Sequence, residues 1–378
     1  MDPKERLRRQ ALGQDVDRVP TIGGWIGGAH NLAALASVTV EQYVADPLPA
    51  VVAACKGLGI DGMVKPAYPR QADEIRTGSV QEQDYAGIEP EAVPEFANSL
   101  PDSEREVLRG FDAAAVEAEY RNYFAAAARD WRGLVPIPNF WDLGGHFPLY
   151  YQFGYVAFLS ACALYPEAVG KIWRNRSLVS REKAKVLARL YRQLDLVPLL
   201  FCGEDLCNNE GPMVSPDFLR KWYFPTVRMI AAPLVESGIR LVHHCDGDVR
   251  PVVDDFVACG FSGLQGFQYE LGVDPREFLH KPVPVGDRML LFGGMSVART
   301  LPFGTPEDVR AEIDWLHDIT DGGRGLFVFT ANVTGPETPV ENLRAGYERA
   351  RSLPFGRIGT ADRDWPGRHI RPGAAPLG

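Results

Sequence analysis

The segment LVHHCDGD, residues 241–248, places two imidazoles, a thiol and two carboxylates directly behind an apolar run. Residues two apart on a strand point to the same side, so His243 and Cys245 can reach one metal ion. Imidazole together with thiolate favours zinc over magnesium or calcium. The alternative is that Cys245 is a small buried hydrophobe and that one histidine is a satisfied core donor.

The other residues of this segment suggest different roles. His244 and Asp246 alternate to the opposite side of the strand unless the strand ends early and turns them inward. They are therefore candidates for orienting the site or for moving a proton. We expect Asp248 to cap the helix that follows.

A second polar group, GEDLC at residues 203–207, also follows an apolar run. Glu204 and Asp205 are adjacent, so on a strand they face opposite sides. We expect Glu204 to point inward and Asp205 to hold a loop. Glu204 or Cys207 would then complete the coordination of the metal.

These residues must be positioned by a regular alternation of strands and helices. From about residue 195, short apolar runs alternate with helix-periodic segments, and nearly continuous apolar runs are typical of strands buried on both faces. The runs lie at 197–202, 239–245, 262–267, 288–294 and 325–331. Three more candidate strands lie upstream, at 21–28, 60–66 and 133–140. Eight parallel strands with covering helices predict a (β/α)₈ TIM barrel.

A serine or threonine followed by proline marks the start of each of three predicted helices, because an N-cap hydroxyl followed by proline favours helix initiation. They are Ser215-Pro216, Thr305-Pro306 and Thr338-Pro339. We expect a single barrel domain over residues 1–357, with an insertion at about 67–132 between the second and third strands. The tail at 358–378 is rich in Gly, Pro and Arg, so it should be loosely ordered.

In a barrel of this kind the carboxyl ends of the strands carry the chemistry. Polar and aromatic residues collect at these ends and are candidates for binding substrate. They are Trp25, Lys65, Asn139, Trp141, Gln268 and Asn332.

Composition narrows the class of protein. Hydrophobic residues make up 46% of the 378, and the net charge of −9 without a basic run argues against a nucleic-acid partner. No apolar segment approaches the roughly 20 residues that cross a bilayer, so we expect no membrane association and a cytoplasmic protein. Six irregularly spaced cysteines predict reduced thiols.

The ordered set of segments resembles the uroporphyrinogen decarboxylase (URO-D) superfamily. It comprises KERLRRQALGQDVDRVP, GEDL with GPMVSPDFLRKWYFPTVRMI, HHCDGDVRPVVDDFVACGFSGLQGFQ, LLFGGMSVARTLPFGTPEDVRAEI and TPVENLRAGYERAR. The resemblance covers most of the chain. It implies the (β/α)₈ barrel, and it implies one of several activities, including decarboxylation of uroporphyrinogen and zinc-dependent methyl transfer with methyl-corrinoid proteins.

Residues 23–31, GGWIGGAHN, depart from true uroporphyrinogen decarboxylases, which resemble one another in an arginine-containing motif at this place. Those cations bind the carboxylates of the substrate. The segment here has no arginine, so the main clamp for a tetrapyrrole with eight carboxylates is missing. Asp61 does fall near the family's catalytic aspartate.

The methyltransferase branch resembles this chain in His243-x-Cys245. Its zinc is commonly completed by a glutamate and by a second cysteine near the last strand, but the matching segment at 330–334 is TANVT. Three alternatives remain: Cys207 supplies the sulfur, the site is rich in oxygen, or no metal binds.

Three hypotheses follow. The first is a zinc-dependent methyltransferase acting on a small molecule or on a methyl-corrinoid partner protein, with a homodimer as a candidate assembly. The second is a metal-independent decarboxylase or lyase, in which Asp61 or Asp246 stabilises a cationic intermediate and Lys65 or Arg70 holds the substrate carboxylate. The third is a non-catalytic ligand-binding barrel, against which the density of titratable residues argues.

Overall fold

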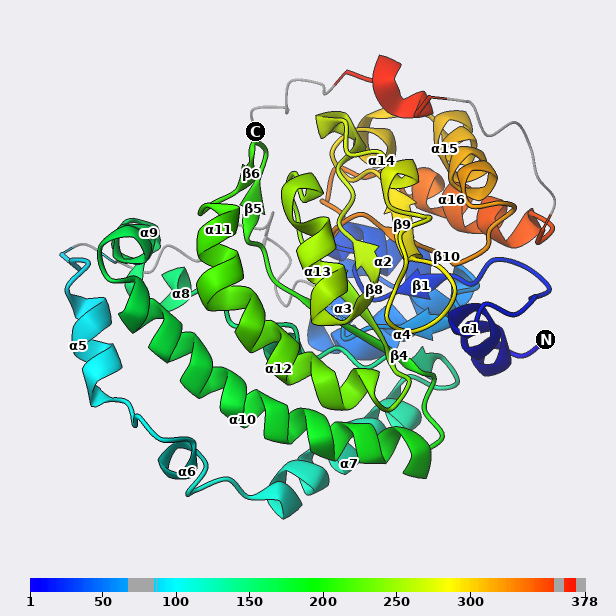
Figure 1. The fold of residues 1–378 in the computed structure, drawn as a ribbon. Coiled ribbons are helices and arrows are strands. Elements are labelled where there is room, and N and C mark those ends of the chain that lie inside the picture. The colour runs from blue at the N-terminus through cyan, green and yellow to red at the C-terminus, as the bar shows by residue number, and fades with distance from the viewer. Residues whose placement is uncertain (67–84, 86, 357–363, 372–378) are drawn as a thin grey trace.

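The computed structural model describes residues 1–66, 85, 87–356 and 364–371, and its central feature is two parallel β-sheets (Figure 1). The smaller sheet has the order β1 (Ile22–Gly23), β2 (Gly62–Met63), β3 (Val135–Pro136). The larger, curled sheet has the order β10 (Leu326–Thr330), β9 (Leu290–Met295), β8 (Phe261–Gln265), β7 (Arg240–His244), β4 (Leu199–Gly203). Each of the eight expected ranges overlaps one of these parallel strands, which confirms an α/β fold.

Single parallel bridges join the two sheets at both edges. Thr21 pairs with Val328 of β10, and Asn139 pairs with Phe201 of β4. A short antiparallel hairpin, β5 (Cys207–Asn208) with β6 (Gly211–Pro212), follows β4.

Side chains from both sheets share one apolar core between them. This inner core includes Ile22, Ile137, Leu199, Phe201, Val242, Leu290, Phe292, Phe327 and Phe329. On β7, Val242 belongs to the inner core, whereas Leu241 packs in the outer core against the helices. Alternation along β7 therefore sends His244 inward and His243 outward.

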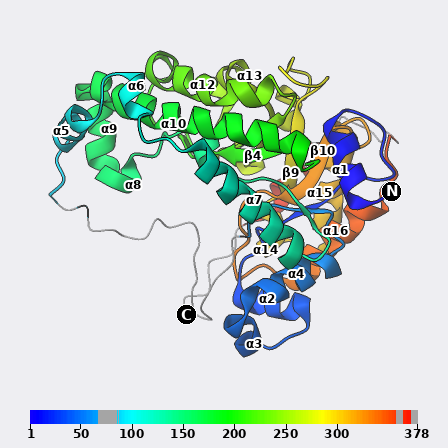
Figure 2. The same cartoon turned by 90° about the horizontal axis from the view of Figure 1, so that it is seen from below.

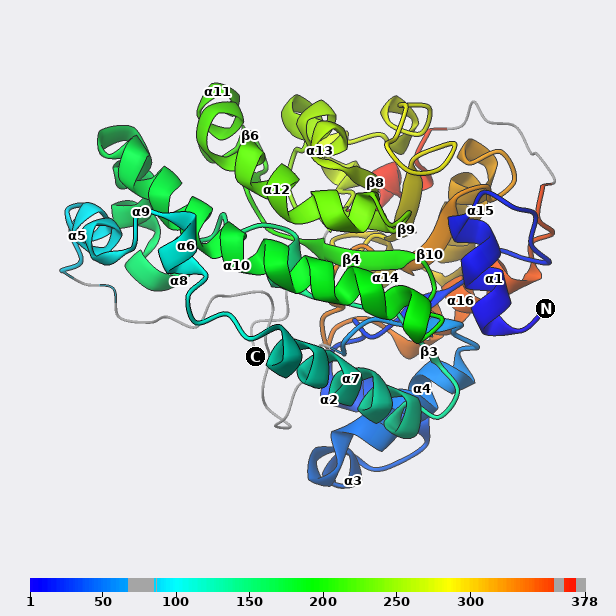
Figure 3. The ribbon, with the colours of Figure 1, turned by 60° about the horizontal axis from the view of Figure 1, so that its bottom comes forward.

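Helices cover the outer faces of the sheets. Figure 1 shows α10 (Pro166–Gln193), α12 (Phe224–Val235) and α13 (Val253–Cys259) on one side of the strands and α15 (Pro306–Ile319) and α16 (Val340–Ser352) on the other. In Figure 3, α2 (Ala29–Ala36), α3 (Val40–Ala45) and α4 (Pro47–Gly57) form a third group. The helix α1 (Pro3–Ala11) sends Leu7 and Ala11 into the inner core.

The segment expected as an insertion holds three helices in its described part, while residues 67–84 and 86 lie outside the described residues. These helices are α5 (Ala92–Ser99), α6 (Glu104–Val107) and α7 (Ala113–Asp130). The last of them packs against α10 and β3. Figure 2 shows α5 with α8 (Tyr150–Phe153) and α9 (Tyr155–Leu164) at the end of α10 that is remote from α1. The short helix α6 lies beside the middle of α10, where Glu104 pairs with Arg181.

Two of the three expected helix caps form. Ser215 accepts from the backbone N–H of Phe218 ahead of α11 (Pro216–Phe218), and Thr305 makes a capping box with Asp308. The expectation for Thr338 is wrong. Pro339 occupies the cap position of α16 instead, and the Thr338 hydroxyl is buried without a hydrogen-bond partner among the described residues.

Part of the tail expected to be loosely ordered is packed against the rest of the molecule. Residues 364–371 are described and include a 3₁₀ turn at Pro366–His369. The Trp365 ring is buried, and its indole N–H donates to Glu312 at 2.7 Å. No helix among the described residues is long and apolar enough to cross a membrane.

Candidate functional site

Two carboxylates and an imidazole meet where β4 and β7 end. One oxygen each of Asp205 and Asp246 and one ring nitrogen of His244 all lie within 4.8 Å of one another. His244 Nε2 is 3.5 Å from Asp205 Oδ1 and 4.0 Å from Asp246 Oδ1. This cluster, called the carboxyl-end triad below, is the one group of three metal-ligating side chains this compact in the part of the chain that the structure describes.

The local backbone explains why the triad is so close. Gly203 pairs with His244 in register, and a Cβ on Gly203 would lie 2.2 Å from the carbonyl oxygen of His244. Gly203 also has a φ of +144°, which an L side chain rarely adopts. The backbone N–H of Asp246 donates to Asp205 Oδ1 at 2.9 Å, which ties the two strand ends together.

Neighbouring amides hold the remaining polar atoms of the triad. Asn332 donates through Nδ2 to Asp246 Oδ2, and Gln265 Oε1 contacts His244 Nδ1. Burial raises the pKa of Asp246 to about 6, an effect that the charge of Asp205 increases and that His244 opposes. The Asp246 carboxyl can therefore gain or lose a proton near neutral pH.

Aromatic rings form a wall beside the triad. The rings of Trp25 and Trp141 lie 5.1 Å and 5.7 Å from that of His244, centroid to centroid, and both meet it edge to face. Trp25 is buried against Phe201 and Phe329, whereas Trp141 is 41% exposed. The wall shields the imidazole on one side and leaves Trp141 accessible to a ligand.

His243 and Cys245, expected as the metal pair, lie on the opposite face of β7 from the triad. The His243 ring stacks on Phe256 at 4.1 Å and meets Phe261 edge to face, and neither ring nitrogen has a hydrogen-bond partner among the described residues. Burial lowers the pKa of His243 to about 3. The two side chains lie on the same side of the strand as expected, but they line a cavity of only about 10 Å³ behind it.

The other two expected ligands also lie away from the triad. Cys207 lies beside Cys245 behind the strand, and burial raises the pKa of the Cys245 thiol. Glu204 accepts from the backbone N–H of Phe147 and from the Tyr223 hydroxyl, at 2.9 Å for the latter, and burial raises its pKa to about 8. Hence Glu204 and Asp205 face opposite sides as predicted, but Asp205, and not Glu204, points toward the triad.

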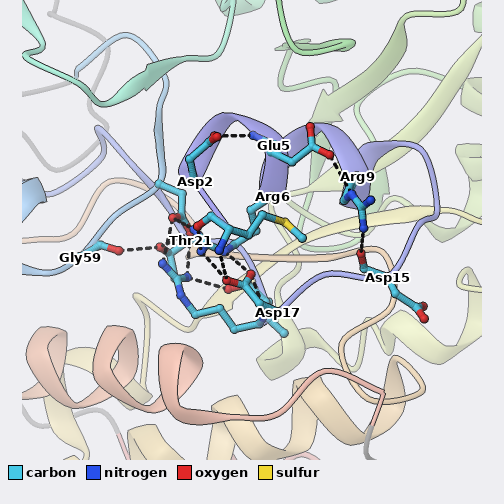
Figure 4. A network of polar contacts seen from close by, with 12 residues as sticks. Asp2, Glu5, Arg6, Arg9, Asp15, Asp17, Thr21 and Gly59 are labelled. Atoms are coloured by element: carbon cyan, nitrogen blue, oxygen red, sulfur yellow. Dashed lines mark hydrogen bonds and ion pairs between the residues drawn. The ribbon is translucent and has the colours of Figure 1, made fainter.

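Asp61, expected as a catalytic group, lies at the other end of the strands, immediately before β2. Its two oxygens accept from Arg6 at 2.6 Å, from Arg18 at 2.8 and 2.9 Å and from the backbone N–H of Thr21 at 3.0 Å. Arg6 also binds Asp17, and Thr21 also contacts Gly59, in the network that Figure 4 shows. Both oxygens of Asp61 are thus paired within this amino-end network, and a catalytic role for Asp61 stays a prediction.

The expected substrate-binding residues divide between the triad and its surroundings. Asn332 contacts the triad through Asp246, and Gln268 lies next to it, since Gln268 Oε1 accepts from the backbone N–H of Gly247 at 2.6 Å. Asn139 is buried at the bridge to β4, and its Oδ1 has no partner among the described residues. Lys65 is exposed after β2, and Arg70 lies outside the described residues.

Sequence reasoning missed two residues of the site. For Asp205 the sequence shows only that it faces the side opposite to Glu204. Alternation does not show which of the two points inward, and Asp205 was assigned to a loop. Gln265 was missed although it is a polar residue inside an apolar run, which is itself a signal of a specific buried partner.

Comparisons with known proteins bear on the family and the fold. Residues 204–353 match the family model of uroporphyrinogen decarboxylase (URO-D). Among solved structures, a methyltransferase from Methanosarcina mazei superposes with a TM-score of 0.60 at 18% identity, covering 93% of this chain and 98% of that one. The latter likeness shows a shared fold. A search of curated proteins found no match.

Proposed function

The expected resemblance to the URO-D superfamily is confirmed, and we propose that this chain is a metal-dependent methyltransferase of that superfamily. The carboxyl-end triad would hold the metal. The match over residues 204–353 supports this proposal because the triad lies within the matched range, and the fold shared with a methyltransferase supports it further.

One observation carries the proposal: the two carboxylates of the triad have no arginine or lysine partner among the described residues. Among the described residues, the ion-pair contacts of Asp205 and Asp246 within 4.0 Å are with the His244 imidazole, and their other polar partners, the Asn332 amide and the Asp246 backbone N–H, are uncharged. Two carboxylates held together in a partly buried place repel each other unless a cation lies between them. A divalent metal ion is the simplest cation that fits.

The donor set also fits the ion. Zinc accepts imidazole nitrogen and carboxylate oxygen, and catalytic zinc sites keep three protein ligands with one open position. Bound there, zinc would lower the pKa of a coordinated substrate group and so form a nucleophile near neutral pH. In this proposal the sulfur ligands expected from the sequence are replaced by oxygen.

The surrounding residues have defined tasks in this mechanism. Asn332 holds one oxygen of Asp246 and leaves the other free to face the triad. The Trp25 and Trp141 rings exclude water from one side of His244. With the metal bound, Asp246 would be held as an ionised ligand.

The eight parallel strands form, in this proposal, one closed (β/α)₈ barrel with the triad at its mouth. The bridges Thr21 to Val328 and Asn139 to Phe201 support closure at both seams. The described helices α5, α6 and α7 would belong to an insertion between β2 and β3. A small molecule or a methyl-corrinoid protein would supply the methyl group in the cytoplasm, and the homodimer remains part of the proposal.

Metal analysis of untagged protein purified without added metal tests the proposal. We expect about one zinc ion per chain in the wild type and its loss in Asp246→Asn. Asp248→Asn is the matched control, because Asp248 lies two residues further on and pairs with Arg250 outside the triad. Folded protein without metal, or metal retained equally in both variants, would refute the metal site.

A metal-independent carboxy-lyase is the second candidate. The raised pKa of Asp246 beside His244 supports it, because this pair could exchange a proton without a metal. Removing the metal with a chelator separates the two functions. Methyl transfer from methylcobalamin to a thiol should stop, whereas metal-independent decarboxylation should continue.

A further inference from the structure

Gln265 is the last residue of β8 and lies directly beside the triad. It pairs in register with His244 across the β7–β8 ladder, and its side chain is 2% exposed. A buried carboxamide must satisfy two N–H donors and one oxygen, so the partners of Gln265 constrain the chemistry of its neighbour.

Both donors of Gln265 are used by the backbone of β10 and the residue after it. Gln265 Nε2 donates to the carbonyl oxygens of Thr330 at 3.0 Å and Ala331 at 2.6 Å. Rotating the amide by half a turn would bring its oxygen against two carbonyl oxygens and its N–H groups toward the imidazole. The orientation with Nε2 toward β10 is therefore the one that satisfies all partners.

This orientation decides which imidazole nitrogen of His244 carries hydrogen. Gln265 Oε1 can only accept, so His244 Nδ1 must donate to it. In the neutral imidazole the lone pair is then on Nε2, the atom that faces Asp205 and Asp246. A lone pair directed at two carboxylates is unfavourable until a cation occupies the space between them.

We propose that Gln265 is a positioning residue that fixes His244 in the Nδ1–H tautomer and so presents Nε2 as a ligand for a cation. The inference rests on the proposed function for its purpose, because the cation is the metal of the triad. Its geometric content, the tautomer, does not depend on whether metal binds. Hydrogen bonds of this kind orient metal-binding histidines in many proteins.

The tautomer can be measured directly by nitrogen-15 NMR of the metal-free protein with the imidazole in its neutral form. Long-range proton–nitrogen correlations distinguish Nδ1–H from Nε2–H, and the signals of His244 among the seven histidines are identified from their absence in His244→Gln. We expect Nδ1–H in the wild type. Nε2–H in the wild type would overturn the inference without any variant.

Substitution of Gln265 sharpens the test. In Gln265→Leu the acceptor is gone, so the imidazole should change to the Nε2–H form and donate to a carboxylate of the triad. Gln268→Leu is the matched control, because Gln268 binds the backbone of Gly247 and not the imidazole, and it should keep Nδ1–H. An unchanged tautomer in Gln265→Leu would contradict the proposed role.

Metal affinity gives a second measurement that separates the two proposals. Competition with a zinc chelator should show about 10-fold to 100-fold weaker binding in Gln265→Leu than in wild type, as for other residues that orient a ligand. If the wild type binds no zinc but shows Nδ1–H, the metal site fails and the assignment of Gln265 stands. If zinc binds equally to both proteins, the positioning role fails and the metal site stands.

Discussion

Carboxylates gather at both ends of the same parallel strands, and their partners differ. At the amino end, Asp61 accepts from two guanidinium groups and from the Thr21 backbone. Figure 4 labels two of these partners, Arg6 and Thr21. At the carboxyl end, Asp205 and Asp246 face an imidazole and carry no arginine or lysine partner among the described residues. A carboxylate whose charge is already compensated stabilises the fold, whereas an uncompensated pair is free to bind a cation.

The difference also explains why burial alone does not identify a site. Asp61 is more deeply buried than either carboxylate of the triad, with 1% of its side chain exposed against 45% for Asp205 and 30% for Asp246. Removing one carboxylate should therefore destabilise the fold strongly at the amino end and only slightly at the carboxyl end. Four predictions test this contrast.

The largest effect is expected at the amino end. Asp61→Asn leaves the Arg6 guanidinium buried without half of its compensating charge, so the free energy of unfolding should fall by about 3–5 kcal/mol in urea denaturation. The matched control is Asp195→Asn, whose exposed carboxylate pairs with Lys4 and Arg8 on the surface. That control should lose less than about 1 kcal/mol, and an equal loss in both variants would remove the distinction between buried and surface pairs.

A buried carboxylate with no arginine or lysine in ion-pair contact among the described residues should instead make stability depend on pH. Glu312 accepts from the Trp365 indole and the Ser296 backbone, and burial raises its pKa from 4.5 to about 8. Between these values only the folded chain keeps the proton, so its contribution to stability falls as pH rises and levels off above about 8.

Glu312→Gln removes this proton while keeping an acceptor for the indole. The stability of the wild type relative to Glu312→Gln should therefore decrease by about 1 kcal/mol per pH unit between pH 5.5 and 7.5. Denaturation of both proteins across this range measures the difference. Parallel curves would show that Glu312 is ionised in the folded protein throughout.

A smaller effect is expected from neutralising the carboxyl end in the absence of metal. Asp205→Asn removes one of two like charges and keeps an oxygen that can accept from the Asp246 backbone N–H. The free energy of unfolding of metal-free protein should change by less than about 1 kcal/mol. A loss as large as that of Asp61→Asn would mean that Asp205 is structural.

The smallest effect is expected behind β7. Cys245→Ser should leave the zinc content of the protein unchanged, because Cys245 lies outside the carboxyl-end triad. Elemental analysis beside the wild type checks this. Loss of zinc in Cys245→Ser, with retention in Asp246→Asn, would return the metal to the ligand pair expected from the sequence.

The strands could be predicted from the sequence, and so could the residues that share one face of a strand. The sequence did not show which face of β7 meets the inner core. Alternation separated His243 and Cys245 from His244 and Asp246. The residues before them, Leu241 and Val242, are both apolar, so the run carries no sign of which face meets the inner core. That choice is made by packing: Val242 joins the inner core.

Contacts between distant parts of the chain account for the other differences. Arg6 and Arg18 reach Asp61 from 55 and 43 residues away, so nothing near Asp61 in the sequence shows that it is fully paired. Likewise, Gln265 finds its partners 65 and 66 residues further along the chain. Local patterns predict which residues can share a face, whereas long-range partners decide their roles.

Anomalous X-ray diffraction from crystals grown with zinc, recorded on both sides of the zinc absorption edge, tests the central claim most directly. The account predicts one anomalous peak bounded by Asp205, His244 Nε2 and Asp246. A peak beside His243 and Cys245 on the other face of β7, or no peak while the three side chains are ordered, would contradict it.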